Sequence, residues 1–116
     1  MNGLICINKD ANMTSFDVVR KVKRIYNTNK VGHSGTLDPN ATGVLVIAIN
    51  RATKSLQYLD VFDKTYHAKI KLGLKTHTGD IWGDTLETQD INSFTEEELL
   101  SVLSSFIGKQ KQRVPM

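Results

Sequence analysis

Apolar and polar residues along the first sixty positions form a pattern that predicts alternating strands and helices. The short apolar run from Gly3 to Asn8 predicts a buried strand. Thr14 and Asp17 have the spacing of a capping box, so we expect a helix over about residues 15–26. At helical spacing, one face of this segment is apolar and would pack on a core. That face holds Val18, Val19, Val22, Ile25 and Tyr26, and the opposite, basic face holds Arg20, Lys21, Lys23 and Arg24.

The next three segments differ clearly in composition. Residues 30–42 are rich in glycine and are predicted to be irregular. Residues 44–49 form a second apolar run, which predicts another buried strand. Residues 51–59 are predicted to form a short helix.

The second half of the chain begins with a regular alternation. In residues 64–72 the apolar side chains occupy every second position, which predicts a half-buried strand. A polar loop over residues 76–84 and a short strand over residues 85–88 are expected next. Thr95 and Glu98 form a second capping box. They introduce an amphipathic helix that ends at Gly108 and whose apolar residues are Leu99, Val102, Leu103 and Phe106.

The predicted order of strand, helix, strand, helix, strand, strand, helix indicates a mixed α/β (α+β) fold. The alternating strand argues against a purely parallel sheet, so we expect a largely antiparallel sheet flanked by helices. A chain of 116 residues suits one domain or part of one. Its tail, residues 109–116, is basic and ends abruptly, which we interpret as a cut inside a longer protein.

Composition adds information about compartment and partners. No apolar run is long enough to cross a bilayer, and the first residues lack the pattern of a signal peptide, so no membrane partner is expected. Cys6 is the only cysteine, which favours the reducing cytoplasm and a small buried apolar role for this residue. Residues 1–60 hold eight Lys and Arg against four Asp and Glu, a modest basic excess that is compatible with a polyanionic partner.

The segment from Lys30 to Leu45 combines glycine with several groups that can carry chemistry. Gly32 and Gly35 permit backbone conformations and close approaches that other residues forbid. Pro39 restricts the backbone of Asp38 to extended conformations, which would orient its carboxylate. His33 adds an imidazole to the same loop. From these residues alone, an ordinary turn is favoured over a catalytic loop.

Other common site templates do not fit the sequence. The glycine loop lacks the Lys-Ser or Lys-Thr pair of a P-loop, and no Gly-x-Ser-x-Gly elbow occurs. His33, His67 and His77 lack the close spacing of metal ligands, so no metal site is predicted.

Gly-His-Ser-Gly-Thr-Leu-Asp-Pro over residues 32–39, followed by Ala-Thr-Gly-Val-Leu over residues 41–45, resembles the motif of the TruB-type pseudouridine synthases. The resemblance extends over nearly the whole chain, to residues 3–9, 13–19, 52–54, 64–66 and 76–80. Asp10 and Asn12 depart from the family pattern of Lys-Pro and a nearby glycine. Family members also run on beyond the length of this chain, so the resemblance implies that residues 1–116 are the N-terminal portion of the catalytic domain.

The resemblance implies isomerisation of the uridine in the T arm of tRNA, with Asp38 as the catalytic carboxylate. Asp38 could attack the ribose, attack the base or remove a ribose proton, and these routes stay open. The uridine must be flipped out of its stack. Tyr66 is implied to stack on the flipped base and His33 to hold the rearranged loop. Weaker candidates for phosphate contacts are Lys9, Lys30 and Lys64.

The implied reaction gains and loses no atoms, so neither a cofactor nor a metal is expected. The segment Thr76–Asp80 resembles the bacterial enzymes, which favours a stand-alone protein that needs no protein partner. In the family, an arginine that pairs with the catalytic aspartate lies later in the chain. We therefore expect residues 1–116 alone to be inactive and to self-associate through exposed apolar surface.

Two other function classes stay open at this point. A catalytically silent RNA-binding fragment would bind tRNA whether or not Asp38 keeps its carboxylate. A small-nucleotide-binding domain would bind mononucleotides in the absence of RNA, although the missing P-loop lysine argues against it.

Overall fold

The computed structural model describes residues 1–112 and contains two compact units, Met1–Thr65 and the unit that begins at Tyr66. Both combine helices with antiparallel strands, so the mixed, largely antiparallel α/β prediction is confirmed. Within residues 1–112, no helix combines the length and the apolar character needed to cross a membrane.

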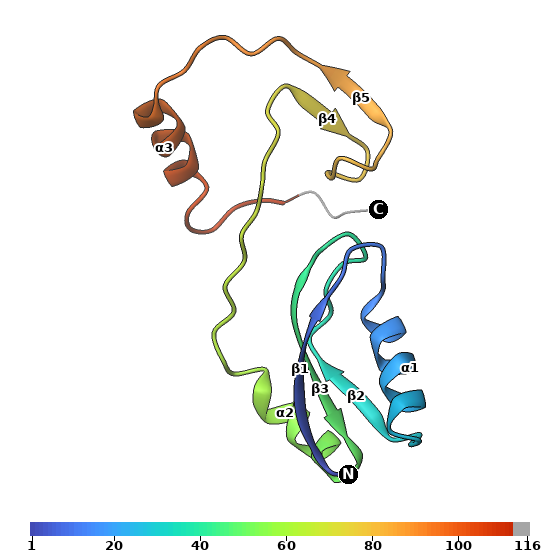
Figure 1. Cartoon of the computed structure of the whole chain (residues 1–116). Helices are drawn as coiled ribbons and strands as arrows, with labels where there is room; N and C mark the ends of the chain where they lie inside the picture. Colours follow the sequence, from blue (N-terminus) through green and yellow to red (C-terminus); the bar gives the residue numbers. More distant parts are fainter. Residues whose placement is uncertain (113–116) are drawn as a thin grey trace. The chain divides into compact units, whose positions relative to one another are not determined.

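The first unit is built on a three-stranded sheet with the order β1-β3-β2 (Figure 1). The outer strands β1 (Gly3–Lys9) and β2 (Val31–Ser34) both run antiparallel to the central strand β3 (Gly43–Ile49). Gly3 and Val31 both pair with Ile49, so the two outer strands begin at the same end of β3. β3 confirms the strand predicted over residues 44–49.

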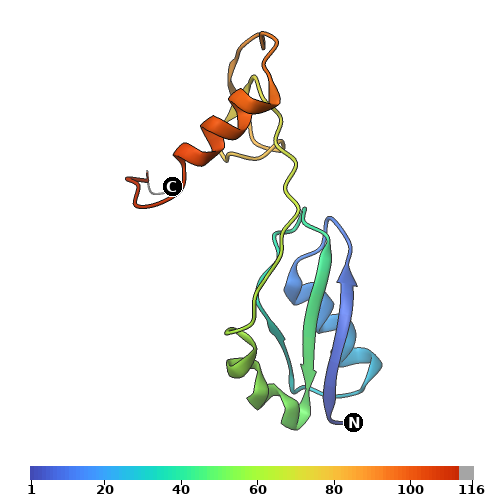
Figure 2. The ribbon, with the colours of Figure 1, turned by 90° about the vertical axis from the view of Figure 1, so that its left-hand side faces the viewer.

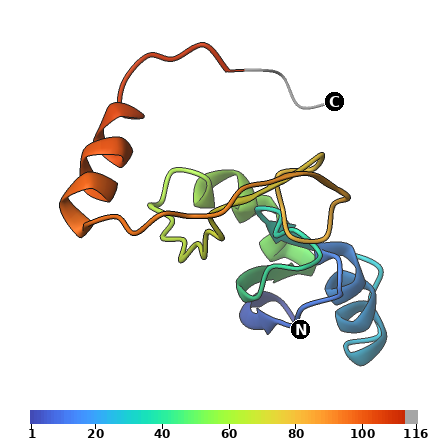
Figure 3. The same ribbon diagram turned by 90° about the horizontal axis from the view of Figure 1, so that it is seen from above.

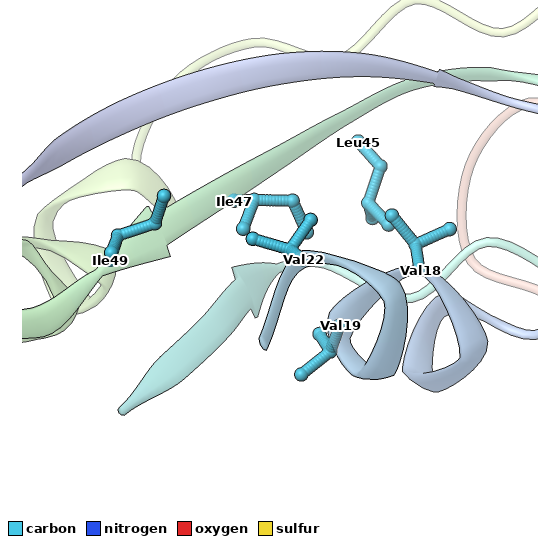
Figure 4. Close-up of a cluster of buried hydrophobic side chains, with 6 residues drawn as sticks. All are labelled: Val18, Val19, Val22, Leu45, Ile47 and Ile49. Atoms are coloured by element: carbon cyan, nitrogen blue, oxygen red, sulfur yellow. The ribbon is translucent and has the colours of Figure 1, made fainter. Parts of the chain in front are cut away.

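Helix α1 (Ser15–Ile25) packs its apolar side on one face of this sheet. Figure 4 shows Val18 and Val22 of the helix facing Leu45 and Ile47 of β3. These side chains are at most 4% exposed, and they form the core together with Val19 and Ile49. The predicted capping box is present, since Thr14 and Asp17 bond to each other's backbone amides at 2.8 and 3.1 Å. The predicted apolar face is shorter than expected, because Ile25 and Tyr26 at the helix end are exposed.

A 3-10 turn, η1 (Asn50–Ser55), and the short helix α2 (Leu56–Leu59) occupy the segment predicted as one helix over residues 51–59. They lie on the face of the sheet opposite α1, as Figures 1 and 2 both show. A Cβ atom on Gly32 would lie 2.8 Å from Leu56 Cδ1. Glycine is therefore the residue that lets β2 and α2 approach this closely.

The second unit contains a two-stranded antiparallel sheet and one helix. β4 (Leu74–Thr76) pairs with β5 (Thr85–Thr88) across the polar loop that the sequence predicts. Helix α3 (Glu96–Ser105) is the orange helix in Figure 3. It begins at the predicted capping box, where Thr95 and Glu98 bond to each other's backbone amides. Its apolar residues form no core, since Val102, Leu103 and Phe106 are each about half exposed or more.

Two predictions about the first unit are corrected. The strand over residues 3–8 is not buried on both sides, because alternate residues face solvent, and Cys6 is consequently exposed rather than buried. The segment 30–42 is not irregular throughout, because Val31–Ser34 form β2. Glycine content concealed this strand, whose backbone pairs along β3 from Ile49 to Val46.

The half-buried strand predicted over residues 64–72 is not formed among residues 1–112. These residues form neither strand nor helix, and all of them are exposed, Tyr66 by 70% and Ile70 by 75%. Alternating side chains give a strand its two faces, but its backbone amides and carbonyls need a neighbouring strand. Among residues 1–112, no strand pairs with this segment.

Candidate functional site

The motif Gly32–Pro39 starts in β2 and continues as a loop toward β3. Gly35 turns the chain just after β2 with a φ of +74°, a left-handed conformation that glycine adopts without steric cost. Further along, the Ala41 amide donates a hydrogen bond of 3.0 Å to the Asp38 carbonyl and closes a turn. Sequence reasoning anticipated special roles for both Gly32 and Gly35, and the geometry assigns a close approach to the first and a left-handed turn to the second.

Asp38 lies on this loop with its side chain exposed. Its neighbour Leu37 packs against the core of the first unit. Ser15 Oγ accepts a hydrogen bond of 3.0 Å from the Leu37 amide and donates one of 3.3 Å to the Leu37 carbonyl. No ion pair involves the Asp38 carboxylate among the described residues.

Lys9 is placed differently from its prediction. Its side chain is 1% exposed, and Nζ donates to three backbone carbonyls, those of Asp10 at 2.9 Å, Met13 at 2.7 Å and Pro39 at 3.2 Å. An ammonium group has three donors, and all three are used here. The structure therefore does not support a phosphate contact by Lys9.

His33 is held inside the motif by its own ring. Its Nδ1 lies 2.6 Å from the Gly35 carbonyl, an atom that can only accept. Nδ1 must therefore carry the proton in this bond, and Nε2 is the nitrogen left for another partner. The bond links the end of β2 to the left-handed turn that follows it.

The remaining candidate site residues belong to different units. Lys30 is exposed just before β2, and Lys64 approaches the motif, since a Cβ atom on Gly35 would lie 4.0 Å from Lys64 Nζ. Tyr66 is the first residue of the second unit and is exposed. The first unit thus holds Asp38, His33, Lys30 and Lys64, while Tyr66 belongs to the second.

Two carboxylates elsewhere have shifted pKa values. The hydroxyl of Thr14, followed by the guanidinium of Arg20, holds the pKa of Asp17 well below its ordinary value. The hydroxyl of Thr78, with backbone amides of Trp82 and Gly83, lowers the pKa of Asp80. In the described part of the chain, no group of three or more His, Cys, Asp and Glu side chains is placed to hold a metal ion.

Ser15 is the residue at this site that sequence reasoning missed. It directly follows the helix cap Thr14, and nothing in the sequence distinguishes it from an ordinary first-turn serine. The burial of Lys9 could have been predicted from the sequence. Lys9 lies an even number of residues after Ile5 and Ile7, so its side chain points to the same, core-facing side of β1.

Comparison with known proteins assigns the family. Residues 23–116 match the TruB family pseudouridylate synthase (N terminal domain), and the chain belongs to this family. It is 45% identical, over its whole length, to tRNA pseudouridine synthase B of Clostridium perfringens (strain SM101 / Type A) and to that of Bacillus subtilis (strain 168). The chain spans 40% and 38% of the length of these two relatives.

Two solved structures share the fold. A chain of an H/ACA RNP bound to a substrate RNA containing 2'-deoxyuridine is 28% identical, with a TM-score of 0.59 over 97% of this chain. A chain of the archaeal box H/ACA sRNP Nop10-Cbf5 complex is 30% identical, with a TM-score of 0.60 over 96% of this chain. In both cases the matched part is 30% of the other chain.

Proposed function

We propose that the full-length protein containing this chain is a tRNA pseudouridine synthase that isomerises the uridine of the T arm. Asp38 is its catalytic carboxylate. The observation that carries this proposal is the placement of Asp38, an exposed carboxylate on a loop whose backbone is bonded on both sides of it. Membership of the TruB family and relatives that are named tRNA pseudouridine synthase B support the reaction and the substrate class.

The reaction needs a base to leave C1′ of the ribose, rotate and rejoin through C5, with no net gain or loss of atoms. A carboxylate can start this process by attacking the ribose or the base, or by removing a ribose proton. Asp38 is accessible enough for each of these routes. Its side chain is exposed while the backbone around it is fixed, which is the arrangement that a nucleophile or base requires.

The other residues act on the RNA in this proposal. The uridine is flipped from its stack, and Tyr66 supplies an aromatic face on which the base stacks. His33, whose Nδ1 is engaged by Gly35, has Nε2 left to contact the rearranged T loop. Lys30 and Lys64 are exposed cations near the motif and contact phosphates. The protein acts without a protein partner.

One observation favours a second function for residues 1–116 on their own, that of a silent RNA-binding fragment. Asp38 has no cationic partner among the described residues, and the chain spans about 40% of its relatives. An ion pair with a cation would fix the direction of this carboxylate at the reacting centre. That cation, an arginine by family resemblance, is proposed to come from sequence outside this chain.

The test is nucleotide-resolution mapping of pseudouridine in an unmodified tRNA transcript after incubation with the purified full-length protein. We expect conversion at the T-arm uridine. A transcript with cytidine at that position is the matched control, and it should remain unmodified. Conversion only at other uridines would overturn the T-arm assignment, and RNA binding without any pseudouridine would favour the silent RNA-binding function.

A further inference from the structure

Only two polar side chains are buried among residues 1–112, and both bond to the backbone beside Asp38. They are Lys9, which is 1% exposed, and Ser15, which is 2% exposed. Burying a hydroxyl or an ammonium costs free energy unless each polar atom is hydrogen bonded. Both side chains meet this condition, and no buried side-chain nitrogen or oxygen lacks a partner in the described residues.

Ser15 fixes the residue before Asp38. Its hydroxyl bonds to both the amide and the carbonyl of Leu37, at 3.0 and 3.3 Å. Ser15 is the first residue of α1, a helix that is anchored in the core by its valines. The position of Leu37 is thereby tied to a rigid element.

Lys9 fixes the residue after Asp38. It is the last residue of β1, and Nζ bonds to the Pro39 carbonyl at 3.2 Å while also holding the carbonyls of Asp10 and Met13. One ammonium group therefore joins the loop between β1 and α1 to the loop that carries Asp38. Lysine can satisfy three acceptors at once because its head group has three donors and no acceptor.

We propose that Ser15 and Lys9 are positioning residues that hold the Asp38 carboxylate in its reactive location. The inference rests on the proposed function of Asp38 and adds two residues to it. With Leu37 bonded to Ser15 and Pro39 to Lys9, the Asp38 backbone is restrained at both neighbours. A displacement of about 1 Å in a reacting group can lower a rate by about a hundredfold. Loss of either bond therefore acts on the chemical step more than on RNA binding.

The first test compares Ser15→Ala with Thr14→Ala in the full-length protein. Thr14→Ala is the matched control, because it weakens the start of the same helix but has no hydrogen bond to Leu37. Single-turnover pseudouridine formation is measured at saturating T-arm RNA, and RNA affinity is measured separately. We expect Ser15→Ala to lower the rate at least about tenfold with affinity changed less than about twofold. Thr14→Ala should keep the rate within about twofold of the unmodified protein.

Equal rates for the two variants, or a parallel loss of rate and RNA affinity in Ser15→Ala, would overturn the positioning role. Lys9→Met gives a second variant that keeps side-chain length while removing the ammonium, and it should show the same separation of rate from affinity. Should Lys9→Met fail to fold, the outcome rests on Ser15→Ala, which leaves the core valines untouched.

Amide hydrogen exchange supplies a measurement that does not depend on activity. The Leu37 amide should exchange faster in Ser15→Ala and at an unchanged rate in Thr14→Ala, because only the first variant removes its acceptor. Unchanged exchange at Leu37 in Ser15→Ala would contradict the inference. If the unmodified protein forms no pseudouridine, the proposed function fails, whereas the exchange result still decides whether Ser15 restrains this loop.

Discussion

At the scale of single residues, the motif loop depends on a glycine that no other residue replaces without cost. Gly35 has a φ of +74°, and a Cβ atom there would meet nothing closer than 4.0 Å. Substitution is therefore opposed by backbone conformation and not by crowding. The turn at Gly35 also supplies the carbonyl that fixes the His33 ring, so a change in its geometry would reach the site.

We predict that Gly35→Ala lowers the free energy of unfolding by about 1 to 2 kcal/mol, the usual cost of a left-handed conformation for a residue with a Cβ atom. Gly35→Asn should cost less, because asparagine adopts this conformation more readily. Denaturant unfolding of the full-length protein measures both values. Equal losses in the two variants would contradict a conformational origin.

Asp17 makes the stability of α1 dependent on pH. The Thr14 hydroxyl, the Arg20 guanidinium and the Thr14 amide favour its charged form and hold its pKa below the ordinary value of 3.8. Because the folded-state pKa is the lower one, the stabilisation is complete above about pH 5 and is lost as the pH falls through the unfolded pKa toward the folded pKa. Asp17→Asn removes this dependence.

We therefore expect the melting temperature of Asp17→Asn to fall less than that of the unmodified protein between about pH 5 and pH 2. Thermal unfolding monitored by circular dichroism provides the comparison. Asp80→Asn is a second variant for the same measurement. The pKa of Asp80, which lies in the other unit, is also lowered, and the main cause is the hydrogen bond from the Thr78 hydroxyl. Identical pH profiles for Asp17→Asn and the unmodified protein would rule out the assigned role of Asp17.

The structural role of a residue was predictable from the sequence where it depends only on near neighbours along the chain. The capping boxes at Thr14 and Thr95 are such cases, because both depend only on residues three positions apart. The roles of Gly32 and Gly35 also followed from residue type. Ser15 was not predictable, because its partner Leu37 lies 22 residues away and only the folded chain brings them together.

At the scale of elements, the clearest difference between pattern and structure lies in residues 64–72. Their apolar residues alternate as in a half-buried strand, yet all of these residues are exposed and unpaired in the described part of the chain. β2 shows the opposite case, a strand with little apolar pattern that forms because β3 offers it a pairing edge. Strand formation is thus decided by the partner as much as by the pattern.

We predict that the alternating segment, residues 64–72, pairs with a strand in the full-length protein. Its amides should then exchange slowly there and rapidly in the isolated 116-residue chain, because exposed amides without partners exchange freely. The Gly43–Ile49 strand, which is already paired, should exchange slowly in both samples. Rapid exchange of residues 64–72 in both proteins would contradict the prediction.

At the scale of the whole molecule, each unit leaves apolar side chains exposed. In the first unit Leu4 and Val44 are 45% and 69% exposed on the sheet. In the second unit Trp82 and Phe106 are 62% and 63% exposed. Contiguous exposed apolar surface is usually covered in a native protein.

We expect the isolated 116-residue chain to self-associate and to show little or no pseudouridine synthase activity. Apolar surface favours association, and Asp38 has no ion pair within the described residues. Size-exclusion chromatography with light scattering and a tritium-release assay on T-arm RNA test the two parts. Multiple turnover by a monomeric 116-residue chain would show that the prediction is wrong.

The proposed role of Asp38 in the chemistry is tested most directly by Asp38→Asn in the full-length protein. Asparagine keeps the size and hydrogen bonding of aspartate but is a poor nucleophile and base. Pseudouridine mapping on a tRNA transcript should show no conversion by Asp38→Asn, while RNA binding persists at the level of the unmodified protein. Asp60→Asn, a change at another exposed aspartate, should keep full activity. Conversion by Asp38→Asn at a rate near that of the unmodified protein would contradict the assignment of Asp38 as the catalytic residue.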